Sequence, residues 1–228
     1  MKKSKRIILL VGGIVFVLTV LIISEIKKAY TTDKEIFTDI YLSNEWGGGS
    51  GSGSKVENAQ PFLDYLQKFI DYSQITSIVD IGCGDWNLMR EIRIPEHIKY
   101  LGLDIVDHVI AENQSRYARK NIKFESVDTL EELSKYKGDL LILKDVMQHW
   151  NKEKILYAIK NIIPNFKYAI LVNAISEKYT VGLDAQTGPH RNLDLEAVPF
   201  FMKIKKIADY DVPSGKKRMY LYINADQS

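Results

Sequence analysis

The sequence predicts an α/β protein whose mostly parallel sheet is covered by helices on both faces. Three observations predict this class. Short apolar segments recur along the chain, amphipathic segments with helical spacing lie between them, and acidic or polar residues follow most of the apolar segments. Doubly wound sheets bind ligands at the carboxyl ends of their strands. The recurring acids therefore indicate a binding site at that edge.

The first predicted strand begins at Ser77 and runs into a glycine turn, with the sequence Ser-Ile-Val-Asp-Ile-Gly-Cys-Gly-Asp. Its β-branched residues favour an extended strand, and Gly82 and Gly84 allow a sharp turn and close approach of a ligand. Asp80 and Asp85 flank the turn, and we expect both carboxylates to point into its mouth. Acids at this place disfavour a phosphate and favour a ligand with positive charge or hydroxyl groups.

Two phosphate-binding motifs are alternatives for this turn. The dinucleotide fingerprint needs a third glycine where this chain has Asn87. The P-loop needs a Gly-Lys-Ser/Thr segment, which does not follow. Neither motif fits, and a nicotinamide-dependent dehydrogenase stays only as an alternative.

Four further strands are predicted at residues 98–104, 122–126, 139–143 and 168–173. The first of these ends in Asp104, where acids of nucleotide-binding α/β units accept hydrogen bonds from ribose hydroxyls. The second leads into Val127 and Asp128, which can pack against an adenine ring and bind its amino group. The third is almost continuously apolar, as expected of a central strand covered on both faces.

Helices are predicted from apolar residues at helical spacing. They cover residues 58–72, 107–120 and 152–163. The first places Phe62 and Leu66 on one stripe, and we expect it to cover the ligand-binding end of the sheet.

The carboxyl end predicts a β-hairpin. Residues 202–209 and 218–223 are strand-like and flank the turn sequence Pro213-Ser214-Gly215. Lys216, Lys217 and Arg218 are assigned to a charged hairpin loop. Such a hairpin would give one edge of the sheet an antiparallel pair.

With these motifs in this order, the chain resembles the class I S-adenosylmethionine-dependent methyltransferases, over residues 77–173 and over most of the chain after about residue 55. The resemblance implies a three-layer Rossmann-like fold with a mostly parallel seven-stranded sheet and an antiparallel edge hairpin. It also implies S-adenosylmethionine as cofactor, whose sulfonium, ammonium and ribose diol suit an acidic site. By position it assigns cofactor binding to Asp80, Gly82, Gly84, Asp104 and Asp128, and Asp85 joins them because it flanks the same turn.

The chain also resembles a narrower, poorly characterised methyltransferase group that carries three further motifs. Here these are Trp46-Gly47 to Ser54, Cys83-Gly84-Asp85-Trp86-Asn87, and Arg191-Asn192-Leu193-Asp194-Leu195 before Pro199-Phe200. This group implies no substrate. Residues 47–54 contain only Gly and Ser, and they are either a flexible linker or a lid that closes on the cofactor or acceptor.

Methyl transfer from a sulfonium needs an aligned acceptor, exclusion of water and, for a hydroxyl acceptor, removal of its proton. Asp145 and His149 are the predicted catalytic residues, because they follow the fourth strand and their spacing places both on one face of a helix. The structural alternative is that Asp145 caps this helix and His149 packs against Trp150. His190 and Arg191, in a loop after the fifth strand, are the predicted substrate contacts. No cluster has metal-ligand spacing, so no metal is predicted.

Composition limits the class of protein and its partners. The chain has 228 residues, 46% of them hydrophobic, and its single cysteine cannot form an internal disulfide. Lys and Arg number 31 against 29 Asp and Glu, and four of the bases lie within the first six residues. The remainder has no basic field that could follow a phosphate backbone, so nucleic acid is not expected as a partner.

The amino end predicts a membrane anchor. Ile7–Ile23 is a stretch of seventeen residues without charge, at the short limit for a spanning helix, and the residues before Ser24 fit a signal-peptide cleavage site poorly. We expect a single-pass anchor over residues 1–28, a linker over 29–56 and a methyltransferase domain over 57–228. Flanking bases weakly favour placing the domain outside the cytosol, but the cofactor is made in the cytosol, and we expect the domain there.

The expected activity is methylation of a sugar or glycan hydroxyl, since a candidate base is present and the domain shows neither a basic field nor an apolar tunnel. A lipid or lipid-linked acceptor is the alternative that the anchor suggests. A second alternative is a non-catalytic module that keeps the fold and binds the cofactor.

Overall fold

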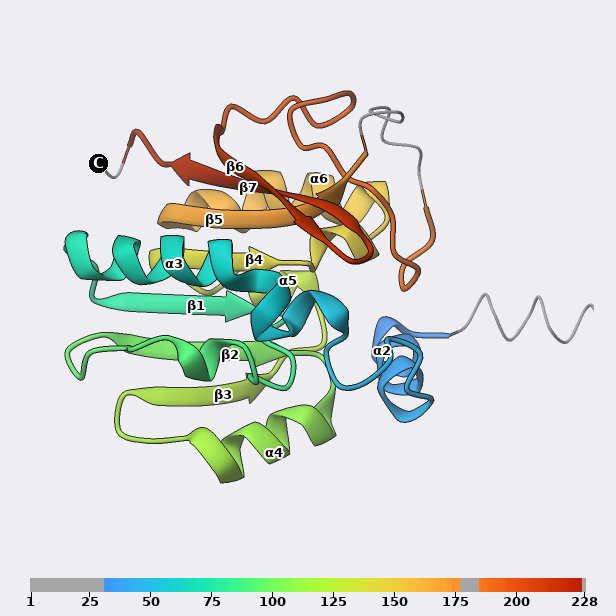
Figure 1. Cartoon of the computed structure of the whole chain (residues 1–228), viewed down its shortest axis with the longest axis horizontal. Helices are drawn as coiled ribbons and strands as arrows, with labels where there is room; N and C mark the ends of the chain where they lie inside the picture. The colour runs from blue at the N-terminus through green and yellow to red at the C-terminus, as the bar shows by residue number, and fades with distance from the viewer. Residues whose placement is uncertain (1–30, 177–184, 227–228) are drawn as a thin grey trace, which may run out of the picture.

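The computed structural model describes residues 31–176 and 185–226. The predicted anchor, Ile7–Ile23, lies outside the described residues. Within them, no helix combines the length and apolar character needed to cross a bilayer. The described part of the chain forms a central sheet with helices on both faces (Figure 1).

The sheet has seven strands in the order β3-β2-β1-β4-β5-β7-β6. Its parallel strands are β1 (Ser77–Ile81), β2 (Lys99–Asp104), β3 (Ile122–Ser126), β4 (Gly138–Lys144) and β5 (Phe166–Ile175). β6 (Lys205–Val212) and β7 (Gly215–Ile223) form the hairpin, and β7 pairs antiparallel with both β5 and β6. The predicted mostly parallel seven-stranded sheet with an antiparallel edge is confirmed.

The central strands are apolar on both sides because helices cover both faces. Residues 140–143 of β4 are each 1% exposed or less. The helices on one face are α3 (Val56–Tyr72) and α4 (Asp107–Tyr117), and those on the other are α5 (Leu130–Leu133) and α6 (Lys152–Asn161). The three helices predicted from spacing are thus present, with ends shifted by two or three residues.

The hairpin differs from its prediction at one point. Lys216, Lys217 and Arg218 do not form a charged loop but lie within β7, opposite residues 173–175 of β5. Lys217 is only 4% exposed, because its ammonium group pairs with the buried carboxylate of Asp145. A run of charges suggests solvent exposure, but a buried partner of opposite charge removes that preference.

The ends of the parallel strands meet under a segment that we call the cap, residues 32–54. The cap consists of α2 (Asp33–Leu42) followed by the Gly/Ser segment 47–54, and it lies at the carboxyl end of the sheet in Figure 1. The succession of strands reverses between β1 and β4, which is where doubly wound sheets leave a ligand crevice. α3 lies along the sheet face instead, so the expectation that it covers the ligand-binding end was wrong.

α2 lies in the segment that the sequence predicted as a linker. A capping box begins it: the Thr32 hydroxyl accepts from the backbone N–H of Glu35, and the Glu35 carboxylate accepts from the N–H of Thr32. Thr-x-x-Glu is a helix-start pattern. The signal for α2 was therefore present in the sequence.

Replacing Leu66 by Ala should lower the free energy of unfolding by about 2–5 kcal/mol, because this fully buried side chain of α3 would leave a cavity against the sheet. Equilibrium denaturation followed by circular dichroism measures the change. Tyr72→Ala, on the same helix but 89% exposed, is the control and should change the free energy by less than about 0.5 kcal/mol. Equal losses for both variants would contradict the described packing of α3.

Candidate active site

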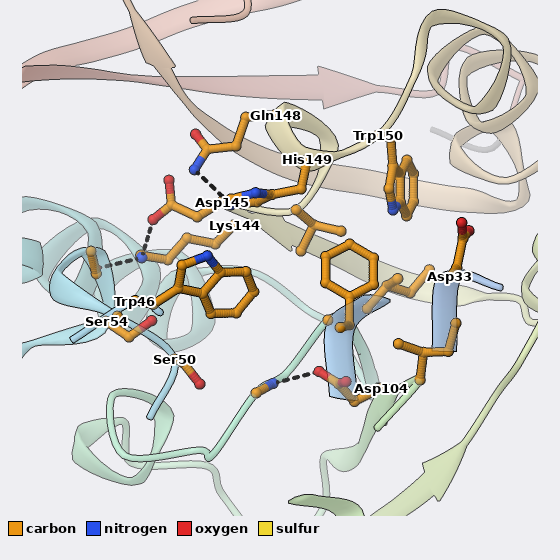
Figure 2. A pocket seen from close by; sticks show the side chains of 18 of the residues that line it. Asp33, Trp46, Ser50, Ser54, Asp104, Lys144, Asp145, Gln148, His149 and Trp150 are labelled. Atoms are coloured by element: carbon orange, nitrogen blue, oxygen red, sulfur yellow. Dashed lines mark hydrogen bonds and ion pairs between the residues drawn. The ribbon is translucent and has the colours of Figure 1, made fainter. Parts of the chain in front are cut away.

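A cavity of about 310 Å³ opens at the carboxyl ends of the parallel strands, beneath the cap. The ends of β1, β2 and β4 form its floor, and Phe37, Tyr41 and Trp46 of the cap line its cover. Figure 2 shows Trp46 directed into the cavity beside His149.

The cavity brings together most of the residues that the sequence singled out. Those that line it are Gly82, Gly84, Asp104, Asp128, Asp145, His149 and His190. Asp80, Asp85 and Arg191 are not among the lining residues, and each has another partner.

Asp80 lies behind the glycine turn and is 3% exposed. Its carboxylate accepts a hydrogen bond of 2.6 Å from the hydroxyl of Tyr100 in β2. Burial raises the pKa of Asp80 to about 7, although the bond from Tyr100 opposes this rise. The expectation that this carboxylate points into the mouth of the turn was wrong, because its side chain joins β1 to β2 within the core.

Asp85 binds the Gly/Ser segment. Its backbone N–H donates to Oγ of Ser50 at 2.8 Å, and its carboxylate accepts from the backbone N–H of Ser50 at 3.3 Å. The carboxylate also accepts from the side-chain amide of Asn87 at 2.9 Å. Contrary to the expectation from its position, Asp85 therefore holds the cap over the glycine turn.

Arg191 and His190 are neighbours with different surroundings. The Arg191 guanidinium donates to the backbone carbonyl of Trp150, so it joins two loops. His190 lines the cavity, and burial lowers the pKa of its imidazole. Of the two predicted substrate contacts, His190 is among the lining residues and Arg191 is not.

Asp104 ends β2 and is fixed by backbone amides. The N–H of Gly84 donates to its carboxylate at 3.0 Å and the N–H of Val106 at 3.1 Å. Burial raises the pKa of Asp104, and these amide bonds oppose the rise. The turn requires glycine here, since Gly82 has a φ of +71° and a Cβ on it would lie 2.4 Å from Cγ2 of Val146.

Asp128 lines the cavity beyond Asp104 and is tied to the cap. The ammonium group of Lys34 in α2 lies 2.9 Å from the Asp128 carboxylate and 2.8 Å from that of Asp107. Hydrogen bonds to Asp107 and Asp128 raise the pKa of Lys34. α2 is thereby joined to the loop that follows β3.

The Gly/Ser segment packs closely on the site. The carbonyl of Gly53 accepts from Nζ of Lys144 at 2.7 Å, and a Cβ on Gly53 would lie 2.7 Å from Oδ2 of Asp145. The Ser50 and Tyr41 hydroxyls are 2.8 Å apart. A freely flexible linker has no such set of contacts, so the structure favours the lid alternative.

Asp145 lies between two buried lysines. Nζ of Lys217 is 2.5 Å from one carboxylate oxygen, and Nζ of Lys144 is 2.7 Å from the other (Figure 2 shows the second pair). Burial by itself raises the pKa of Asp145, but the two ammonium groups outweigh it and lower the pKa to about 2. Both oxygens of the carboxylate are bound to ammonium groups, so neither is open to a proton from an acceptor hydroxyl. This arrangement argues against Asp145 as the base.

The segment after β4 is not an α-helix. Asp145 has a left-handed backbone with a φ of +61°, and a single 3-10 turn, η3 (Met147–His149), follows it. The helical spacing that predicted a common face for Asp145 and His149 was therefore wrong. Both side chains still reach the cavity, because the backbone turns sharply at Asp145.

The imidazole of His149 has a partner on each nitrogen. Nδ1 lies 2.8 Å from the carbonyl oxygen of Gly188, which can only accept, so Nδ1 carries the proton. Nε2 lies 3.3 Å from the side-chain nitrogen of Gln148, whose oxygen accepts from the N–H of Ala174. Burial lowers the pKa of His149 to about 4. At neutral pH the imidazole is uncharged, and Nε2 is its proton-accepting atom.

Aromatic rings surround this imidazole. The ring of Trp46 lies 5.1 Å from it between centroids, and Phe37 meets it edge-on at 6.4 Å. The ring of His190 is 6.0 Å away. These rings keep the environment of His149 poor in water.

Several cavity residues had no role in the sequence predictions. They are Asp33, Phe37 and Tyr41 of α2, together with Lys144 and Lys217. The capping box could have located the first three. Nothing local marks Lys217, because its partner Asp145 is 72 positions away in the chain.

Across residues 31–176 and 185–226, no three His, Cys, Asp or Glu side chains are grouped so that they could hold a metal ion.

Comparison with solved structures shows the same fold elsewhere. The magnesium protoporphyrin IX methyltransferase ChlM from Synechocystis PCC 6803, solved with bound SAH, is 16% identical with a TM-score of 0.54 over 84% of this chain and 100% of that chain. The N-methyltransferase NodS from Bradyrhizobium japonicum WM9 is 10% identical with a TM-score of 0.54 over 74% of this chain and 97% of that chain. The N-terminal domain of EvdMO1, solved in the presence of SAH and D-fucose, is 12% identical with a TM-score of 0.51 over 73% of this chain and 83% of that chain. At these identities the likeness shows the fold alone.

Sequence comparison shows the family. No curated protein matches the chain. The family model of the O-methyltransferase domain matches residues 26–193, which is well over half of the 228 residues. The glycine turn, the acids at the strand ends and this match agree, and the chain belongs to the O-methyltransferase domain family as an S-adenosylmethionine-dependent methyltransferase.

Proposed function

We propose that this enzyme transfers the methyl group of S-adenosylmethionine to a hydroxyl group of a sugar or glycan, with His149 as the general base. The observation that carries the proposal is the uncharged His149 imidazole, with its proton fixed on Nδ1, in the wall of a covered cavity. A hydroxyl must lose its proton during transfer, whereas a sulfonium leaves without help.

In this proposal the acids at the strand ends hold the cofactor. Asp104 accepts hydrogen bonds from the ribose hydroxyls, Asp128 accepts from the adenine amino group, and the turn at Gly82 and Gly84 passes close to the methionine part. His149 lines the same cavity, so its imidazole would be available to an acceptor bound beside the cofactor. The Gly/Ser segment above it excludes water, which would otherwise compete with the acceptor.

Asp145 has a supporting role here. Its carboxylate holds the buried ammonium groups of Lys144 and Lys217. Lys217 also lies 3.3 Å from the side-chain oxygen of Gln148, so the ion pairs extend to the neighbour of the base.

The part of the cavity around His149 suits a sugar ring as acceptor. Trp46 and Trp150 offer flat apolar faces, while Asp33, His190 and Ser54 offer partners for hydroxyl groups. This mixture fits a ring with one apolar face and several hydroxyls better than it fits an acyl chain. The fold accompanies such a ligand in EvdMO1, which was solved with D-fucose.

The proposal keeps the membrane anchor at Ile7–Ile23, with the catalytic domain in the cytosol. Its support is the uncharged stretch itself and the cytosolic origin of the cofactor.

Incubation of the enzyme with methyl-labelled S-adenosylmethionine and separated cell glycans, lipids and proteins should label the glycan fraction. The expected product is base-stable, as an ether is and a methyl ester is not. Label confined to lipids or proteins would overturn the proposed acceptor. Binding of the cofactor by calorimetry without transfer to any fraction would favour the non-catalytic module.

Replacing His149 by Gln should lower kcat by about 10²–10⁴-fold, because the acceptor proton then has no positioned base. Affinity for S-adenosylmethionine should stay close to that of the unchanged enzyme, since His149 lies beyond the cofactor acids. Steady-state kinetics on the labelled glycan, together with calorimetry, measures both quantities. An unchanged kcat would exclude His149 as the base.

Asp104→Asn should change the affinity for the cofactor, which His149→Gln should leave unchanged. It should weaken S-adenosylmethionine binding by about 1–3 kcal/mol, because one acceptor for the ribose hydroxyls becomes a donor. Calorimetric titration measures the loss. Asp80→Asn is the matched control at the same turn, because its carboxylate faces Tyr100 in the core. A larger effect at Asp80 than at Asp104 would contradict the assigned cofactor site.

A further inference from the structure

The cap touches the imidazole of His149 as well as covering the cavity. The indole of Trp46 lies 5.1 Å from the imidazole between ring centroids, and the edge of Phe37 lies 6.4 Å away. Both residues belong to the cap. His149 is only 9% exposed in this arrangement, and two of the rings beside it come from a segment outside the sheet.

The cap also reaches the other nitrogen of the imidazole through Gly188. The carbonyl of Gly188 accepts from Nδ1 at 2.8 Å, and its N–H donates to the backbone carbonyl of His149 at 2.9 Å. A Cβ on Gly188 would lie 2.8 Å from Cγ2 of Ile36, so α2 rests directly on this residue. The position of α2 therefore limits where the Gly188 carbonyl can lie.

One lysine joins the three segments involved. Nζ of Lys154, in α6, lies 2.5 Å from the carboxylate of Asp33 in the cap and 2.7 Å from the hydroxyl of Thr187. Thr187 directly precedes Gly188. The cap, the loop that fixes Nδ1 and the helix behind the sheet are thus held by a single ammonium group.

We propose that the cap is part of the catalytic apparatus, because Trp46 and Gly188 hold His149 in a dry, fixed orientation in which it can act as base only while the cap is seated. Trp46 and Gly188 are then positioning residues, since they act through His149. The inference rests on the proposed role of His149. It couples enclosure of the cofactor to orientation of the base, so the imidazole is held in place only while the cavity is covered.

Three charged or titratable groups outside the cap also face His149. They are His190, Asp145 and Lys217, in the loop after β5, at the end of β4 and in β7. What the cap changes is the burial of the imidazole, which is the largest cause of its low pKa.

Trp46→Ala should raise the pKa of His149 from about 4 toward its ordinary value of 6.5, because water reaches the ring. The uncharged form is the base, so the acidic fall of the pH–rate profile should move to higher pH by the same amount. Histidine-selective NMR on the full chain with S-adenosylmethionine bound reports both the pKa and the tautomer. The His149→Gln variant identifies the signal among the four histidines.

Three further variants separate this inference from simpler roles. Trp46→Phe keeps an aromatic cover and should keep the low pKa. Lys154→Met touches neither the imidazole nor the cofactor acids, yet it releases Asp33 and Thr187 and should shift the pKa in the same direction as Trp46→Ala. Leu42→Ala, also in α2 but 72% exposed, should change nothing.

The outcomes are distinguishable. If the pKa of His149 stays near 4 in both Trp46→Ala and Lys154→Met while His149→Gln is inactive, the role of the cap is overturned. The proposed role of His149 as base then stands. If Trp46→Ala raises KM and leaves the pH–rate profile in place, Trp46 is an acceptor contact and the inference fails. Full activity of His149→Gln overturns the proposed function itself, whatever the NMR shows.

Discussion

The site depends on the buried carboxylate of Asp145, which binds the ammonium groups of Lys144 and Lys217. From this carboxylate one line of contacts runs through Lys144 to the carbonyl of Gly53 in the cap. The other runs through Lys217 to the side chain of Gln148, and from there to His149. Buried ion pairs add little to stability overall, since desolvation offsets their attraction, but they fix geometry strongly. Here the fixed geometry joins β4, β7, the cap and the proposed base.

Two neighbouring groups in this site, Asp145 and His149, both have lowered pKa values, but for different physical reasons. Two adjacent ammonium groups keep Asp145 charged, with a pKa of about 2, whereas burial among aromatic rings keeps His149 uncharged, with a pKa of about 4. The charged carboxylate is bound on both oxygens. Nε2 of the uncharged imidazole has a 3.3 Å contact with the side-chain nitrogen of Gln148, which an acceptor hydroxyl would have to replace. The same cavity is also lined by the acids Asp104 and Asp128.

The segment of lowest sequence complexity turns out to be among the most constrained. Residues 47–54 are Gly and Ser only, which by composition describes a flexible linker. In the folded protein their small side chains allow the backbone to approach Asp85 and Asp145 closely, with Gly53 and Ser50 in direct contact with the site. Glycine is needed there for close approach rather than for flexibility. The cap thus encloses the cavity without bulky side chains at the point where the cofactor must fit.

The sequence by itself determined the five parallel strands, the glycine turn and the acids Asp104 and Asp128, because each depends on residues close together in the chain. Strand periodicity, turn glycines and the residue that follows a strand are local properties, and parallel strands bring their carboxyl ends to one edge without further information. Only the tertiary structure decided that Asp80 faces the core, that Asp85 holds the cap, that Lys217 is buried and that α2 rests on Gly188. Each of these depends on a partner far away in the chain, such as the 72 positions between Asp145 and Lys217, and no local pattern records which distant group will satisfy a charge.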